Sequence, residues 1–156
     1  MKALSMIILC LACLWGQAQD KTPKGFKKGV VVLEDSTVLA GYIREHIRHH
    51  ASLTFIGEEG KGRRELDGSE IRSAEFDGLR YMCIKGDFFR IVSEGEFCYL
   101  QKSSDAAGRP VYNGTEPLLI NGTEGRPGDY FIYNSRMRSL KPVDRKSLEK
   151  LNLTGL

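Results

Sequence analysis

Short runs of β-branched and aromatic residues, separated by turn-forming residues, restrict this chain to folds built from short strands. Residues 29–33 (GVVVL) and 37–43 (TVLAGYI) are separated only by Glu-Asp-Ser. Val, Ile, Tyr and Phe favour extended backbone, and a short polar break between two such runs is typical of a hairpin. Residues 53–56 (LTFI) predict a third short strand.

The segment 79–102 predicts a β-meander. Its runs are residues 79–85, 88–92 and 97–102. Gly86-Asp87 is expected to form a type II′ turn, which takes glycine at its first central position. The meander is the clearest part of the predicted sheet.

The part of the chain before the meander is less regular. Residues 57–64 predict a charged, glycine-rich loop. Residues 65–76 alternate poorly, and Ile71 and Ala74, three apart, favour one helical turn leading into a strand.

The tetrapeptide Asn-Gly-Thr-Glu occurs twice, at residues 113–116 and 121–124. Asn-Gly is a strong turn signal because both residues tolerate positive φ. The stretch is therefore read as turn, strand and turn, with a strand over 115–120. Pro117 cannot donate to a sheet, so this strand is expected to be an edge or irregular one. Both triplets also fit the Asn-x-Thr glycan-acceptor rule, which is the alternative interpretation.

The expected architecture is an all-β domain over residues 29–140. Residues 103–110 are expected to form a loop, and residues 129–133 the last strand. The chain then has about eight short strands, which indicates a small antiparallel barrel or sandwich. Asp144 is a plausible helix N-cap, with Leu148 and Leu151 three apart after it. Residues 141–156 are therefore expected to form a tail with a short C-terminal helix.

The first 18 residues have the layout of a secretory signal peptide. Lys2 is followed by an apolar run over 3–15, and the small residues Gly16 and Ala18 suit a cleavage site after Ala18. The run is too short for a spanning helix, which needs about 20 residues. The alternatives are a retained membrane anchor and a lipoprotein modified at Cys13. Residues 19–28 form a polar leader. We expect an exported protein, periplasmic or extracellular, with no transmembrane segment after cleavage.

Charge and motifs argue against several functions. The chain has 23 Lys and Arg against 20 Asp and Glu, a formal net charge of +3, with no basic stripe. A nucleic-acid partner is therefore not expected. Nucleophile-elbow, zinc-protease, phosphate-loop and dinucleotide motifs are all missing from the sequence. We expect a protein that is not an enzyme and that needs no cofactor.

All three histidines lie within five residues, at His46, His49 and His50. Imidazoles beside a carboxylate, here Glu45, are ligand types for zinc or copper, so a metal site on these three residues is one interpretation. A polar strand end followed by a turn is the second interpretation, and a pH-responsive patch is the third.

Two cysteines, Cys83 and Cys98, remain after signal cleavage. In an oxidising compartment they could form a disulfide, or they could be two buried free thiols. In the expected register, Cys83 pairs with Arg90 and Arg90 with Tyr99. Alternation then places the two cysteines on opposite faces of the sheet, which weighs against a bridge unless a bulge intervenes.

Over residues 28–100, the segments KKGVVVLEDSTVLAGYI, SLTFIG and SEIRSAEF resemble small exported, mostly uncharacterised β-rich proteins of Bacteroidota. The resemblance implies an exported β-rich domain and carries no catalytic residues. We therefore expect a binding or assembly module of the cell envelope, whose partner is an envelope protein or a small ligand. The alternative is a metal- or ligand-binding periplasmic protein that uses the histidines.

Overall fold

The computed structural model describes residues 22–60, 62–95, 97–112, 114, 116–144 and 146–147. Within them, twelve strands and one helical turn confirm that the protein is mainly β. The elements are β1 (Lys27–Leu33), β2 (Val38–Glu45), α2 (Ile47–His50), β3 (Ser52–Gly57), β4 (Arg63–Asp67), β5 (Ile71–Phe76), β6 (Leu79–Ile84), β7 (Asp87–Ser93), β8 (Cys98–Lys102), β9 (Pro110–Tyr112), β10 (Pro117–Leu119), β11 (Tyr130–Asn134) and β12 (Ser139–Val143).

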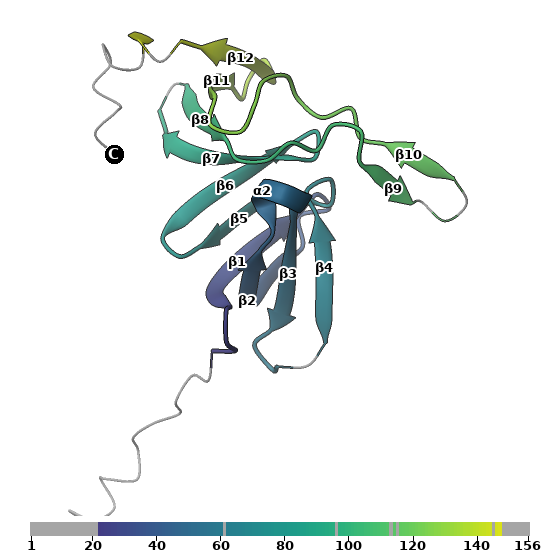
Figure 1. The fold of residues 1–156 in the computed structure, drawn as a ribbon. Helices are drawn as coiled ribbons and strands as arrows, with labels where there is room; N and C mark the ends of the chain where they lie inside the picture. Colours follow the sequence, from purple (N-terminus) through teal and green to yellow (C-terminus); the bar gives the residue numbers. More distant parts are fainter. Residues whose placement is uncertain are drawn as a thin grey trace, which may run out of the picture.

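Ten strands form one antiparallel sheet in the order β12-β11-β8-β7-β6-β5-β1-β2-β3-β4, and β9 and β10 form a separate two-stranded sheet. The large sheet is open, with β12 and β4 as its edges, so the closed barrel or two-sheet sandwich expected from the sequence is not confirmed. Figure 1 shows the β9–β10 hairpin projecting from the rest of the domain.

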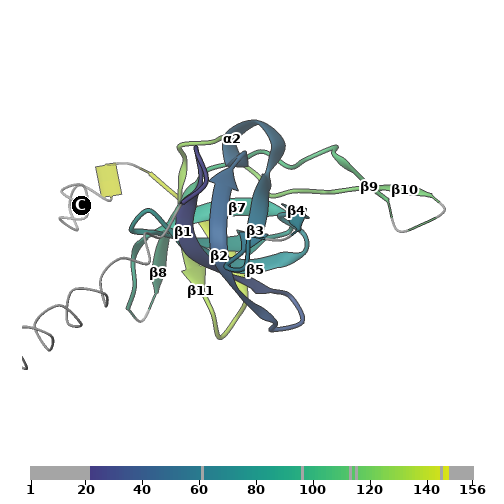
Figure 2. The ribbon, with the colours of Figure 1, turned by 90° about the horizontal axis from the view of Figure 1, so that it is seen from below.

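The large sheet has to curl, because residues 68–70 alone connect β4 to β5 while β1, β2 and β3 lie between these two strands. In a flat sheet, four strand spacings would separate them by about 19 Å. The four Cα–Cα steps from Asp67 to Ile71 reach at most about 15 Å. Figure 2 shows the result, with β1–β3 lying across the direction of β5 and β7.

The curled sheet buries apolar side chains on both of its faces. The larger cluster lies inside the curl and includes Val31, Ile43, Leu53, Leu66, Ile71 and Phe88. The smaller cluster contains Phe89, Leu100 and Phe131. Phe88 and Phe89 are neighbours on β7 and point to opposite faces, yet both are fully buried. Both clusters therefore cover β7, and β6 likewise has Tyr81 and Cys83 in the larger cluster and Met82 and Ile84 packed against the smaller one.

Four strands, β4, β5, β9 and β12, were not expected as such. β4 and β5 show why the sequence did not reveal them. β4 carries mostly charged, exposed residues, with only Leu66 fully buried, as is common for an edge strand. In β5, the register with β1 shifts between Ser73 and Ile71. This bulge leaves Ile71 and Ala74 both buried although they are three residues apart. The helical turn expected at Ile71 and Ala74 is therefore wrong, because a bulged strand imitates helical spacing.

The turn between β6 and β7 lies one residue earlier than expected. Ile84 pairs with Asp87, so Lys85 and Gly86 are the central residues. Their φ values of 50° and 82° are both positive, as a type I′ turn requires, so the type II′ turn expected at Gly86-Asp87 is wrong. The register moves by two residues as a result, and Cys83 pairs with Phe88.

The two ends of the chain lie largely outside the described residues. The expected signal peptide (1–18), residues 19–21 of the leader, and residues 145 and 148–156 of the expected tail lie outside the described residues. Residues 141–143 belong to β12, and the Ser147 amide donates to the Asp144 carbonyl at 2.9 Å. Among the described residues, no helix is long and apolar enough to cross a membrane.

Candidate binding surface

A buried ion pair joins the start of β7 to the end of β8. Lys102 Nζ lies 3.2 Å from Asp87 Oδ2, and neither side chain has any exposed area. Burying two charges costs solvation energy, which their attraction offsets only when further hydrogen bonds use the remaining polar capacity. The surroundings of this pair therefore decide whether it is stable.

Both groups have further hydrogen-bond partners. Asp87 Oδ1 accepts from the Ser104 hydroxyl at 3.0 Å and from the Ala106 amide at 2.7 Å. Asp87 Oδ2 accepts from the Thr123 amide and from the Thr123 hydroxyl, both at 2.7 Å. Lys102 Nζ also donates to the carbonyls of Thr123 and Gly125, at 2.7 and 3.0 Å.

The residues Asp87, Lys102, Ser104 and Thr123 are called the buried polar cluster below. Ser104 precedes the β9–β10 hairpin in the chain and Thr123 follows it. Because both bind the same carboxylate, the cluster holds together the two segments from which the hairpin emerges.

The hairpin base is also held by backbone contacts. The Gly108 amide donates to the Ile120 carbonyl at 2.9 Å, and the Ile120 amide donates to the Arg109 carbonyl at 2.8 Å. Arg109 lies 3.3 Å from the Asp67 carboxylate of β4. At Gly122, which has a φ of +63°, a Cβ would lie 2.9 Å from the Ala107 amide nitrogen. The close approach of these two segments therefore requires glycine.

The hairpin itself exposes large apolar side chains. Tyr112, Leu118 and Leu119 are 75%, 54% and 67% exposed, although they lie on two strands of only three residues each. A two-stranded sheet without a covering layer gains little from burial. The exposed side chains therefore contribute little to the fold and form a candidate surface for binding.

The repeated Asn-Gly-Thr-Glu sequence has two different roles. Of the first copy, Gly114 and Glu116 lie between β9 and β10, and Asn113 and Thr115 are outside the described residues. The expected strand between the copies exists as β10, and Pro117 begins it in a sheet whose strands are both edges, as predicted. In the second copy, Gly122 has the expected positive φ, but no hairpin follows; Thr123 binds Asp87 instead. Glycan attachment stays a prediction.

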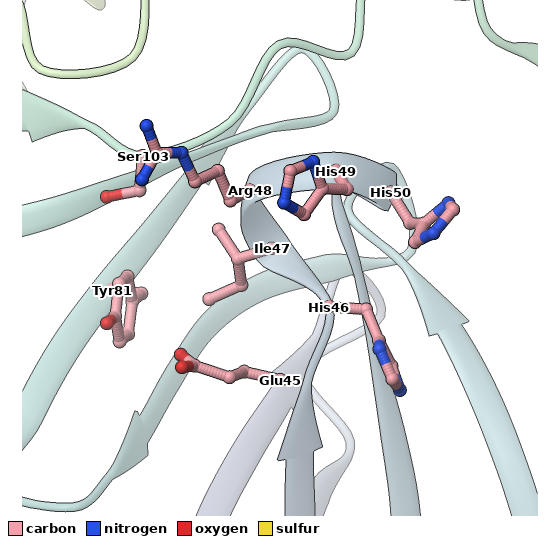
Figure 3. A pocket seen from close by; sticks show the side chains of 8 residues that line it. All are labelled: Glu45, His46, Ile47, Arg48, His49, His50, Tyr81 and Ser103. Carbon is pink, nitrogen blue, oxygen red and sulfur yellow. The ribbon is translucent and has the colours of Figure 1, made fainter.

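His46 directly precedes α2, and His49 and His50 are its last two residues. Ile47 is buried beneath the turn, and Ala51 ends it with a left-handed backbone. His46 and His50 meet edge to face with ring centroids 6.3 Å apart. Figure 3 shows the three imidazoles pointing in different directions. In the part of the chain that the structure describes, no three His, Cys, Asp or Glu residues are placed to hold a metal ion. The metal site at His46, His49 and His50 thus gains no geometric support.

A groove of about 400 Å³ lies beside α2 and is lined by Glu45, the three histidines, Arg48, Tyr81 and Ser103. Glu45 and Tyr81 lie on one side of Ile47, with His46 and His50 on the other (Figure 3). Burial raises the pKa of the Tyr81 hydroxyl, and the Glu45 carboxylate adds to the rise while Arg90 opposes it. At neutral pH, Tyr81 offers a neutral donor to a polar ligand.

Cys83 and Cys98 are both free thiols. Cys83 belongs to the cluster inside the curl, and Cys98 packs against the cluster on the opposite face. The two cysteines therefore lie on opposite faces of the sheet, as predicted. The prediction holds although the register differs by two residues, because a shift of two residues leaves each side chain on the same face. Burial raises the pKa of the Cys83 thiol well above its ordinary value, and nearby carboxylates, first Glu34, add to the rise.

The buried polar cluster was not predicted, although the sequence contains one signal for it. Lys102 lies two and four residues after Leu100 and Cys98, so alternation places its charge on an apolar face. Asp87 has no such signal, because it directly follows a turn. Ser104 and Thr123 lie in irregular segments, where no periodicity applies.

Comparison of the chain with protein-family models, with curated proteins and with solved structures gives no match. The residues of the hairpin and of the buried polar cluster are therefore the basis for a functional proposal.

Proposed function

We propose that this protein is an exported, non-enzymatic β-domain that binds a protein partner in the bacterial cell envelope. The observation that carries the proposal is the β9–β10 hairpin with Tyr112, Leu118 and Leu119 exposed. Single exposed apolar residues are ordinary, whereas three of them gathered on two paired strands of three residues each are unusual and point to a binding role. Aromatic and aliphatic side chains of this size are also frequent anchors in protein interfaces.

The proposed location rests on the first 18 residues, which have the layout of a signal peptide, and on the resemblance of residues 28–100 to exported proteins of Bacteroidota. The periplasm and the cell exterior both fit. We further infer that β1–β5 act as a small barrel-like scaffold and that the tail after residue 143 forms a short helix.

A role in binding rather than catalysis is supported by the state of the most buried reactive groups. The Cys83 thiol is held protonated by burial, whereas nucleophilic cysteines need a lowered pKa. The Asp87 carboxylate already accepts hydrogen bonds from Ser104, Ala106 and Thr123. Both groups fit structural roles.

The proposal is tested by crosslinking the tagged full-length protein in its native cells and identifying the adducts by mass spectrometry. We expect one dominant envelope protein. A chain recovered only as uncrosslinked monomer, at its normal expression level, contradicts the proposal. A cytoplasmic location in cell fractionation contradicts the envelope assignment.

A second candidate function is the binding of a small polar ligand or of zinc or copper at the groove beside α2. The mixed lining of Glu45, Arg48, Tyr81 and three imidazoles supports a polar ligand, whereas for zinc or copper the support is the type of the ligands and not their placement. Calorimetric titration of residues 19–156 with zinc, and with the His46→Ala, His50→Ala double variant as control, tests the metal. Binding that the double variant loses supports it, and equal binding by both proteins contradicts it.

A further inference from the structure

The free edges of the β9–β10 hairpin lack half of their hydrogen-bond donors. Leu118 pairs with Val111, whereas Pro110 and Pro117 belong to the two flanking pairs. The Ile120 amide donates to the Arg109 carbonyl, so Ile120 and Arg109 are opposite each other as a hydrogen-bonded pair. Hydrogen-bonded pairs recur every two residues in an antiparallel ladder, so Leu118 and Val111 also form a hydrogen-bonded pair, and the flanking pairs point their amides outward. The prolines therefore occupy outward-facing positions, where a strand of another protein would need an amide donor.

Strand addition is thus a poor mode of binding for this hairpin, and its side chains are left to make the contacts. Tyr112 and Leu119 share one face of the ribbon, because their pairs are two residues apart, and Leu118 lies on the other face with Val111. Leu118 and Leu119 are 54% and 67% exposed, so both faces are uncovered.

We propose that the hairpin inserts into an apolar cleft of its protein partner and that the walls of the cleft cover both faces. This inference rests on the proposed function and specifies its surface. A second copy of the chain, pairing hairpin to hairpin, would cover only one face of each ribbon. A lipid surface fits less well, because Glu116 near the tip is the only charged residue in 110–119 and anionic membranes repel it.

The base of the hairpin supports this mode of binding. The buried polar cluster fixes the segments on both sides of the hairpin, and the Arg109–Asp67 ion pair joins its first residues to β4. Binding by a segment that is already held in place loses less conformational entropy than binding by a free loop. The hairpin is therefore presented to the partner largely preformed.

The test places a photoreactive phenylalanine analogue at Leu118 in one full-length protein and at Leu119 in another, in native cells. Met137, 75% exposed in the turn between β11 and β12, is the control position. We expect both hairpin positions to crosslink to apolar segments of the same protein and the Met137 position to give no such adduct. Three results would overturn the proposal that a cleft covers both faces: a crosslink between two copies of the chain, a crosslink to lipid, or a crosslink from only one of the two hairpin positions.

The Leu118→Ser, Leu119→Ser double variant provides an independent readout, with Val38→Ser as the matched control at a site that is 63% exposed. We expect the double variant to lose partner binding by about tenfold or more and the control to retain it. If a partner is captured equally by both variants, the proposed function stands and the hairpin inference fails. If the wild-type chain captures no partner, both fail.

Discussion

The β9–β10 hairpin and the buried polar cluster at its base are neighbours in the fold but distribute apolar and charged groups in opposite ways. Tyr112, Leu118 and Leu119 are exposed, whereas the charges of Asp87 and Lys102 are completely buried. Burying a charge costs solvation free energy unless it is paired, whereas an apolar side chain left exposed gains no free energy from burial. The difference indicates a division of roles: the base determines stability, and the hairpin determines binding.

The largest effect is expected from Asp87→Ala. The substitution leaves the Lys102 ammonium buried without its carboxylate and removes the acceptor of Ser104 and Thr123. Breaking a buried pair in this way costs about 3–5 kcal/mol. The free energy of unfolding in urea measures the loss. Asp105→Ala, at an exposed carboxylate 4.0 Å from the same ammonium, is the control and is expected to cost far less. Equal losses in the two variants would mean that the ion pair is not the main contact.

A smaller effect is expected from Thr123→Val, which keeps the side-chain volume but removes the hydroxyl that donates to Asp87. A hydrogen bond to a charged group contributes about 1.5–3 kcal/mol. Thr123→Ser retains the hydroxyl and is expected to preserve most of the stability in the same urea experiment. A serine variant as unstable as the valine variant would assign the effect to the methyl group instead.

The two cysteines report on the interior without any substitution. Because burial raises the pKa of Cys83 well above its usual value, little thiolate forms at neutral pH, and Cys83 should react slowly with iodoacetamide. Cys98 is partly exposed and should react first, although burial also raises its pKa. Mass spectrometry of the non-reduced protein counts the labels. A protein that takes up label only after reduction would contain the disulfide that the opposite faces disfavour.

The smallest effect on stability is expected in the hairpin. Leu118→Ser and Leu119→Ser remove side chains that are more than half exposed, so each should change the free energy of unfolding by less than about 0.5 kcal/mol. A loss of 2 kcal/mol or more in urea would show that these leucines pack against the domain and are not free to bind a partner.

Much of the β-structure could be predicted, because β-branched runs such as those of β1, β2 and β7 report directly on strand formation. β4 was missed because an edge strand need not be apolar, and β5 was misread because its bulge places Ile71 and Ala74 on one face. The face of each cysteine was predicted correctly although the register was wrong by two residues.

The candidate site could not be predicted in the same way. The buried polar cluster depends on contacts such as that between Asp87 and Thr123, which are 36 residues apart. No spacing rule relates two residues brought together by the curl of a sheet and by irregular segments. The histidines are the converse case: they lie close together in the sequence, yet among the described residues they are not placed with a third ligand to hold a metal ion, although the His46 and His50 rings meet edge to face.

The division of roles is tested most directly by measuring the free energy of unfolding and partner capture together on two variants, the Leu118→Ser, Leu119→Ser double variant and Thr123→Val. We expect the hairpin variant to unfold like the wild type and to bind the partner about tenfold or more weakly. We expect Thr123→Val to be less stable but to capture the partner while it remains folded. Retained capture by the hairpin variant would contradict the central claim that the exposed hairpin binds the partner.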